Sequence, residues 1–188
     1  GFWKGPGGFD LDRGVYLFPE LAVYGASARG PLAGGIFNVE YGYYDSKDAG
    51  LHGNDYAPPS EQRLLLGYQR ELARELNLGL QYYLTHIEDY GDYQNDRLPG
   101  SPDRDRNRHV ATVRLSKLLL NQDLRLSLFA FVSPSDEDGY LRPQLYYRFD
   151  DRRSLEVGAN VFFGEDNDTF FGQLQDNTNI YTAFRYDY

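Results

Sequence analysis

The sequence predicts an all-β fold, an antiparallel up-and-down transmembrane β-barrel with about nine strands in 188 residues. Residues 179–188 alternate between apolar and polar side chains and end on an aromatic residue, and the same alternation recurs along the chain. No apolar run approaches the roughly 18 to 20 residues that a membrane-spanning helix needs. Because every backbone polar group in lipid has to be paired, a membrane protein without such helices has to be a closed barrel.

The final strand shows the alternation most clearly. Every second residue from the end suits lipid: Tyr188, Tyr186, Phe184, Thr182 and Ile180. The intervening residues suit water: Asp187, Arg185, Ala183, Tyr181 and Asn179. Successive side chains of a strand point to opposite faces, so this segment would have one apolar face and one polar face.

The other predicted strands are separated by long and short connections in turn. In chain order, the nine strands are residues 19–27, 36–45, 62–72, 76–88, 108–120, 123–132, 140–149, 154–164 and 179–188. The short connections cannot hold crossover helices, so successive strands would pair as antiparallel hairpins. The long connections carry most of the acidic runs, which is typical of solvated loops.

One strand has a competing interpretation. Leu64, Leu65 and Leu72, with Arg and Glu between them, would also fit one face of an amphipathic helix over residues 61–76. Gly67 and Tyr68 inside this segment, and the strand that follows after a short connection, favour the strand.

The composition fits a membrane barrel and excludes several other classes. The chain has 17 Tyr and 12 Phe but one Trp and no Cys. Tyrosine suits a membrane interface, although a soluble β-sandwich can also be rich in it. The absence of Cys excludes a disulfide scaffold and a thiolate site. A net charge of −9 disfavours nucleic acid as a partner, because a phosphate backbone requires a basic surface.

The terminal strand resembles that of Gram-negative outer-membrane barrel proteins, in which alternating apolar residues precede a terminal aromatic. The resemblance implies an assembly signal at Phe184, Tyr186 and Tyr188, which the barrel assembly machinery would read. A wider resemblance, over residues 2–188, is to porin-like outer-membrane proteins of uncharacterised role in proteobacteria, and residues 24–27, 162–165 and 170–173 carry it. It implies the bacterial outer membrane as the location, with lipid and lipopolysaccharide around the barrel.

The number of strands bears on the domain organisation. Nine is odd, whereas single-chain bacterial barrels have an even number of strands. With the carboxy terminus in the periplasm, the long loops would be extracellular, and residues 1–14 would lie in an external loop. We therefore expect residues 1–188 to form one barrel domain that is the carboxy-terminal part of a larger barrel. A further strand within residues 1–17 would instead allow a small closed barrel of about eight or ten strands.

The alternation also predicts which side chains line the lumen. An Arg or Lys facing lipid at the midplane costs about 2 to 4 kcal/mol, so charged residues should point inward. The predicted lumen-lining residues are Arg63, Arg114, Arg125, Arg142, Arg148, Arg185, Glu40, Glu156, Gln81, Gln144 and Asn160. They would form either a charged constriction that selects solutes or a plugged lumen in which Arg and Glu pair with each other.

The sequence offers little support for catalysis. His86 precedes two acidic residues at a strand end, and Ser101, Ser133 or Ser135 would have to act as the nucleophile. Catalytic partners are spatial rather than sequential neighbours, so no spacing here reports a triad. The acidic runs 136–138 and 165–168 match no complete Ca²⁺ loop. No phosphate loop, dinucleotide fingerprint or zinc spacing is present, so we expect no enzyme activity, no cofactor and no metal.

The predicted function is that of an outer-membrane porin, the passive transport of small solutes through a charged lumen. The alternative is a structural barrel that sheathes or anchors a partner in an outer-membrane complex, such as a periplasmic protein or a lipoprotein.

Overall fold

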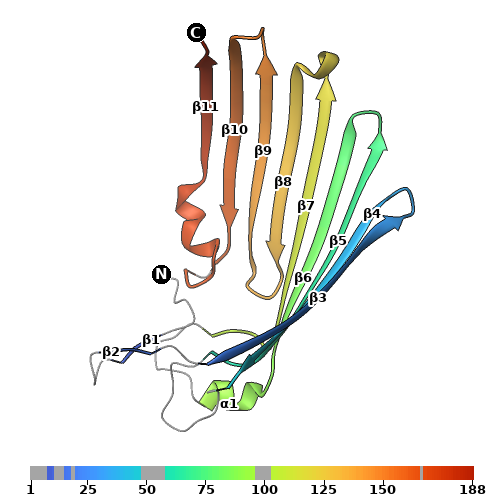
Figure 1. Cartoon of the computed structure of the whole chain (residues 1–188). Helices are drawn as coiled ribbons and strands as arrows, with labels where there is room; N and C mark the ends of the chain where they lie inside the picture. The colour runs from blue at the N-terminus through green and yellow to red at the C-terminus, as the bar shows by residue number, and fades with distance from the viewer. Residues whose placement is uncertain (1–7, 11–14, 18–19, 48–57, 96–102, 166) are drawn as a thin grey trace.

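A single nine-stranded antiparallel sheet dominates the computed structural model, which describes residues 8–10, 15–17, 20–47, 58–95, 103–165 and 167–188 (Figure 1). The spatial order of the strands is their sequence order, because each strand pairs with its neighbours in the chain. The strands are β3 (Leu21–Leu32), β4 (Gly35–Ser46), β5 (Glu61–Ala73), β6 (Leu76–Ile87), β7 (Asn107–Leu119), β8 (Leu124–Ser133), β9 (Asp138–Arg148), β10 (Arg153–Phe163) and β11 (Asn179–Tyr186).

The predicted all-β antiparallel fold is confirmed, including the competing segment at residues 61–76. β5 occupies most of that segment and pairs along its length with both β4 and β6. The irregularity there is a register shift between Glu71 and Ala73, next to the short turn. Pairing on both sides satisfies the backbone of this segment, which is why the sheet overrides its helical periodicity.

Several short elements were not predicted. A short helix, α1 (Tyr90–Asn95), lies in the loop expected at residues 89–107, and two 3₁₀ segments, η1 (Leu120–Gln122) and η2 (Gly172–Asn177), lie in other connections. The strands β1 (Gly8–Asp10) and β2 (Val15–Leu17) pair only with each other. Elements this short carry no hydrophobic period from which they could be predicted. No helix in the described part of the chain is both long enough and apolar enough to cross a membrane.

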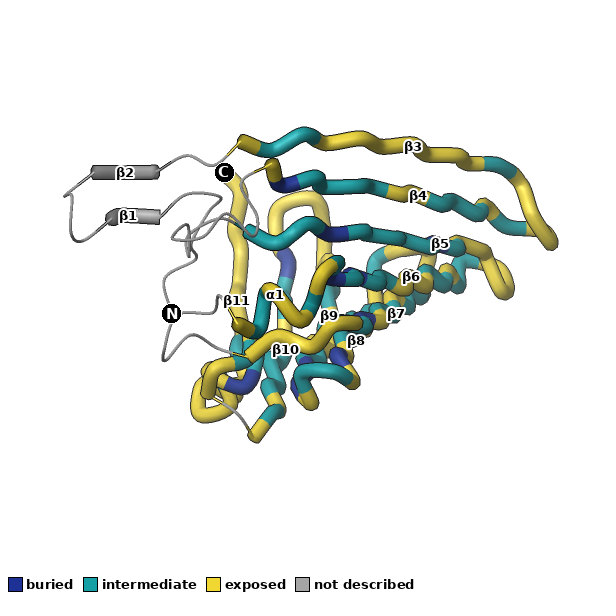
Figure 2. Tube along the Cα trace, turned by 90° about the horizontal axis from the view of Figure 1, so that it is seen from below, coloured by how far each residue is buried: buried dark blue, intermediate teal, exposed yellow. Residues whose placement is uncertain are grey.

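The sheet is curved and open. Viewed from below, the chain of strands bends round from β7 to β11, so the sheet forms a trough (Figure 2). Its two edges are β3 and β11, each of which pairs with one neighbour in the sheet. Because every pair is antiparallel and the sheet has nine strands, both edge strands run in the same direction.

The described residues contain almost no hydrophobic core. Only Ile87 and Val110 are buried apolar side chains, exposed by 1% and 6%. Several of the other buried residues are polar and lie where the strands meet the long loops, among them Glu61, Thr85, Ser133 and Asp138. A soluble domain of this length normally buries a much larger apolar interior, so the burial pattern is the unusual feature of this fold.

Glu61 is the central charged group at this end of the sheet. Its side chain is 5% exposed, and it accepts hydrogen bonds from Nη2 of Arg63 at 2.8 Å and from Nη2 of Arg104 at 2.6 Å. Arg104 belongs to the loop before β7, so Glu61 ties that loop to the start of β5. Loss of either guanidinium partner would leave a buried carboxylate charge without full compensation, which would destabilise the folded protein.

We predict that Glu61→Gln lowers the free energy of unfolding by about 1 to 3 kcal/mol, because it removes the negative charge that both arginines share. Denaturant unfolding of the purified protein measures this change. Glu40→Gln is the matched control, since Glu40 is exposed and accepts only a 3.5 Å hydrogen bond from Asn38. Equal losses in the two variants would contradict a special role for Glu61.

Candidate functional site

The strand register sorts the side chains of the sheet into two faces. On one face, cross-strand neighbours such as Leu80 and Val113, or Leu126 and Leu145, are mostly apolar. The opposite face carries Arg114 next to Phe129 and Gln144 next to Ser127. All eleven residues predicted to line a lumen lie on this second, polar face, because the register of every strand pair keeps them on the same side.

The apolar face is exposed and has aromatic residues at both ends. Leu80 is 39% exposed, Val157 37% and Ile180 82%. Near the long loops this face carries Tyr24, Tyr43 and Phe163, whereas Tyr41 and Tyr82 lie at the middle of β4 and β6. Near the short turns it carries Phe37, Tyr68, Tyr147, Phe184 and Tyr186. Aliphatic residues fill most of the band between these two groups, so the face has an apolar centre with aromatic borders.

The polar face contains both paired and unpaired arginines. Besides the Glu61 cluster, Arg108 pairs with Asp136 at 2.6 Å and Arg148 with Asp123 at 2.8 Å. On β7 to β11, the remaining arginines of this face have no carboxylate within ion-pair distance among the described residues; they are Arg114, Arg125, Arg142 and Arg185. All four are exposed.

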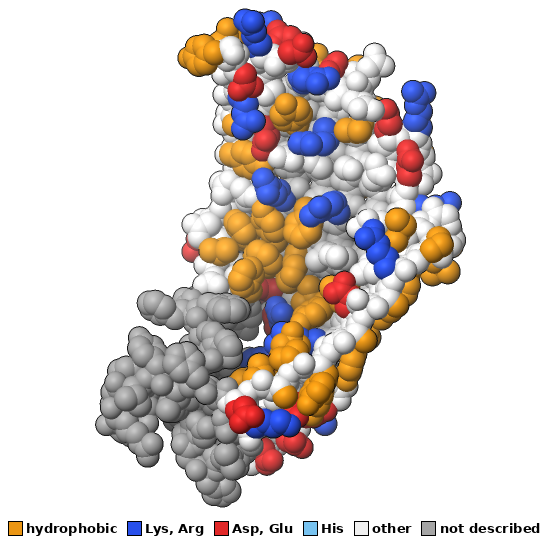
Figure 3. All heavy atoms as spheres, in the orientation of Figure 1, with side chains coloured by type: hydrophobic (Ala, Val, Ile, Leu, Met, Phe, Trp, Pro, Cys, Tyr) orange, Lys and Arg blue, Asp and Glu red, His pale blue; other side chains and the backbone are white. Residues whose placement is uncertain are grey.

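Three of these unpaired arginines lie against aromatic rings. Cζ of Arg125 is 5.1 Å from the centre of the Tyr146 ring, and Cζ of Arg114 is 5.9 Å from that of Phe129. Cζ of Arg142 is 6.0 Å from the Tyr181 ring, whose hydroxyl oxygen accepts a 3.3 Å hydrogen bond from Nη2. Blue basic side chains therefore surround an orange apolar cluster in Figure 3.

The apolar cluster on the polar face is aromatic and includes a residue from a loop. Phe171, just before η2, packs with ring centres 4.8 Å from Phe131 and 5.2 Å from Tyr140. Tyr140 also stacks on Phe162 at 4.9 Å. The loop is held by Asp138, whose buried Oδ2 accepts a 2.7 Å hydrogen bond from the backbone N–H of Phe171. This segment therefore lies over the polar face of the sheet.

The remaining predicted residues make local contacts. Gln81 accepts a 3.3 Å hydrogen bond from Thr112, Gln144 donates to Glu156 at 2.6 Å, and Asn160 accepts from Tyr140 at 2.6 Å. The aromatic members of the face were not predicted as site residues. Phe129 and Phe131 occupy polar positions of the alternation in β8, and that departure from the pattern could have identified them.

The structure places the candidate catalytic residues in separate contacts. Nδ1 of His86 lies 2.6 Å from Oδ1 of Asn107. The Ser133 hydroxyl lies 2.8 Å from Oδ2 of Asp136, and Ser135 donates to the Asn107 carbonyl oxygen at 3.2 Å. Among the described residues, His86 makes no hydrogen bond to a serine. Ser101 and His52 lie outside the described residues.

The acidic runs at residues 136–138 and 165–168 bear on the question of a metal site. Asp136 pairs with Arg108, and Asp138 holds Phe171. Asp166 lies outside the described part of the chain. Within that part, the acidic and His side chains nowhere form a group of three or more that could hold a metal ion.

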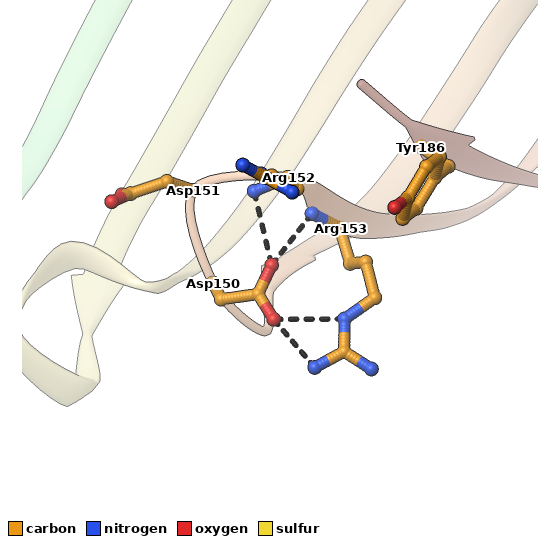
Figure 4. A pocket seen from close by; sticks show the side chains of 5 residues that line it. All are labelled: Asp150, Asp151, Arg152, Arg153 and Tyr186. Atoms are coloured by element: carbon orange, nitrogen blue, oxygen red, sulfur yellow. Dashed lines mark hydrogen bonds and ion pairs between the residues drawn. The ribbon is translucent and has the colours of Figure 1, made fainter. Parts of the chain in front are cut away.

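A shallow, open pocket lies at the turn between β9 and β10. It is lined by Asp150, Asp151, Arg152, Arg153 and Tyr186 (Figure 4). Oδ1 of Asp150 accepts from the backbone N–H groups of Arg152 and Arg153, and Oδ2 accepts from Nε of Arg153 at 2.8 Å. The Arg153 side chain, followed by the Arg152 backbone N–H, lowers the pKa of Asp150 below its ordinary value. These contacts fix the turn. Both carboxylate oxygens of Asp150 already accept hydrogen bonds from the turn itself, so they are poorly placed to bind a ligand.

The lowered pKa predicts how this turn responds to acid. Folding favours the ionised form of Asp150, so its stabilising effect is complete above the ordinary carboxyl pKa of about 4 and is lost as pH falls through the lower folded-state pKa. Between about pH 5 and about pH 2, the unfolding midpoint of the wild type should therefore fall slightly further than that of Asp150→Asn. Asp151→Asn, with no such hydrogen bonds, should behave like the wild type. Identical pH profiles for all three proteins would contradict this role of Asp150.

We compared the sequence with protein-family models and with curated proteins, and neither comparison found a match. The function has therefore to be inferred from the geometry of the described residues.

Proposed function

We propose that this sheet forms part of a porin-like barrel in the bacterial outer membrane, which lets small solutes pass passively through its lumen. The exposed apolar face carries the proposal. Leu80, Leu126 and Leu128 lie on one continuous surface and are 37 to 39% exposed, although almost nothing apolar is buried elsewhere in the described chain. An apolar surface of this extent requires an apolar solvent, and lipid provides one.

The dimensions of the sheet support this proposal. Strands β3 to β10 have 10 to 13 residues. At about 3.3 Å per residue, about 12 residues extend for about 40 Å, and a tilt of about 40° reduces the height to about 30 Å. This height matches the hydrocarbon layer of a bilayer, which is about 30 Å thick.

The aromatic borders support the same location. Tyr24 and Tyr43 near the long loops, and Tyr68 and Tyr147 near the short turns, would lie at the two membrane–water interfaces. The long loops would then be extracellular and the short turns periplasmic, as in other barrels. Lipid and lipopolysaccharide would surround the barrel. The barrel assembly machinery would recognise the terminal aromatics.

Closure of the barrel needs strands beyond this sheet. β3 and β11 run in the same direction, so they cannot pair antiparallel with each other. An entirely antiparallel barrel therefore requires an odd number of additional strands between them. This geometry supports the interpretation of the chain as part of a larger barrel, which would leave room for a water-filled lumen.

The polar face would then be the wall of the lumen. Arg114, Arg142 and Glu156 would be in contact with water, and their field would act on solutes. The segment that carries Phe171 lies over this wall and would narrow the lumen. Such a wall supports a channel better than a tightly packed plug, because four of its arginines are exposed and have no carboxylate partner.

A matched pair of substitutions in β6 tests the location of the two faces. Leu80 and Gln81 are adjacent and exposed, and they lie on the apolar and the polar face respectively. We predict that Leu80→Arg prevents assembly or destabilises the barrel by about 2 to 4 kcal/mol, whereas Gln81→Arg is tolerated. Heat-modifiable migration of the protein in isolated outer membranes measures the folded fraction. Normal folding of Leu80→Arg would contradict the membrane proposal, because an exposed Arg is harmless in water.

Conductance tests the channel itself. We predict that the purified, folded, full-length protein produces stepwise conductance in planar bilayers. A correctly folded barrel that produces no channel events would contradict the channel proposal and favour the alternative of a structural barrel around a partner. The control is Asp151→Asn, which changes only the turn and should conduct like the wild type. Leu80→Arg is not a suitable control, because we expect it to disturb folding.

A further inference from the structure

We propose that the polar face of β7 to β9 selects organic anions that carry an aromatic ring, such as arene carboxylates. This inference rests on the proposed channel and names the class of solute that its wall favours. Two features of the wall carry it. Three arginines there, Arg114, Arg125 and Arg142, have no carboxylate within ion-pair distance among the described residues, and aromatic rings lie between and beside them.

The charge on this part of the wall is positive and available. Arg114, Arg125 and Arg142 are exposed and have no carboxylate within ion-pair distance in the described chain. On the same face of β8 to β10, Glu156 lies beside Tyr146 and accepts a 2.6 Å hydrogen bond from Gln144, and Asp138 holds the backbone of Phe171. Glu156 acts on Arg142 through space but forms no salt bridge with it, so the three guanidinium groups keep their donors available.

Aromatic rings position these arginines without removing their charge. Tyr181, on β11, reaches across Gly158 on β10 to contact Arg142 on β9. A Cβ atom at residue 158 would lie 2.5 Å from the Tyr181 hydroxyl oxygen, so only glycine allows this crossing. The remaining guanidinium donors of Arg142 are free to bind a carboxylate from the lumen, which arginine can do with two parallel hydrogen bonds.

The register places the charge directly beside aromatic surface. Arg114 and Arg142 are both direct cross-strand neighbours of Phe129, one on each side. Adjacent strands are about 4.8 Å apart, so the two arginines flank the ring across about 10 Å. The next row toward the long loops, about 7 Å away, contains Phe131 and Tyr140.

This arrangement fits a planar anion better than other solutes. A carboxylate between Arg114 and Arg142 would place an attached ring over Phe129, because Tyr140 is already stacked on Phe162 and Phe171. Ring stacking stabilises a bound aromatic anion, and an aliphatic anion of the same charge lacks this contact. A cation with an aromatic ring would gain the stacking but would be repelled by the arginines.

Ion selectivity tests the role of the charges. In bilayers with a KCl gradient, the reversal potential of the full-length protein should show a preference for Cl⁻ over K⁺. Arg114→Gln and Arg142→Gln should each lower this permeability ratio at least about twofold. Arg148→Gln is the matched control, because Arg148 is already paired with Asp123 near the short turns and should change the ratio less. A cation-selective wild type, or an unchanged ratio in both variants, would overturn the proposal.

A pair of probes tests the aromatic part. Benzoate and cyclohexanecarboxylate have the same charge and similar size, but only benzoate is aromatic. We expect benzoate to block the KCl current at a lower concentration, and Phe129→Leu to remove this difference while the Cl⁻ preference remains. Equal block of the wild type by the two acids would overturn the aromatic requirement.

A binding measurement separates failure of this inference from failure of the channel proposal. Saturation-transfer NMR on the folded protein in detergent reports benzoate contact without requiring conduction. Benzoate contact that is lost in Arg142→Gln, in a protein without channel events, would retain the anion site and reject the channel. Conduction without selectivity or benzoate contact would retain the channel and reject the anion site.

Discussion

A sheet with no second layer is the constraint on which the rest of this structure depends. Nine strands form one layer, and beyond the short pair β1–β2 the described residues contain no second sheet and no long helix that could cover its apolar face. The strands must nevertheless keep their apolar residues on one side, because a shift of one residue would exchange the two faces. The continuous register from β3 to β11 therefore segregates charge from hydrocarbon over the middle of the sheet, with Arg70 and Lys117 on the apolar face only toward the short turns, and it does so without a core.

The same constraint explains where the polar contacts lie. In a low-dielectric surrounding, unpaired charges are costly, so the charged residues gather on the polar face and at the strand ends. At the long loops, Glu61 joins Arg63 to Arg104, and Asp138 anchors Phe171. At the short turns, Asp123 and Asp150 hold arginines near their own strands. These contacts stabilise the ends of hairpins whose middle sections are held by the backbone ladder and by neighbouring side chains.

The sequence was sufficient for the strands and their faces, but not for contacts between distant segments. Alternation together with turn signals located all nine strands, and alternation placed Arg114, Glu156 and the other predicted residues on one side, because a period of two determines the face directly. It could not indicate that Phe171 folds onto Tyr140, since a loop has no period. The contact between Arg142 and Tyr181, 39 residues apart, also depends on the register of two strand pairs and on Gly158 between them.

Aromatic rings, and not carboxylates, contact three of the arginines, although a carboxylate could also fix the position of a guanidinium group. A carboxylate in place of Phe129 or Tyr181 would fix a guanidinium by a salt bridge, as Asp123 does for Arg148. It would also cancel the charge that the lumen could use. A ring fixes the arginine by a weaker contact and leaves its net charge intact. On the hydrated wall that we propose, this weaker contact is sufficient, because the exposed arginines would remain solvated. The rings therefore orient the guanidinium groups without neutralising their charge, as the proposed anion-attracting wall would require.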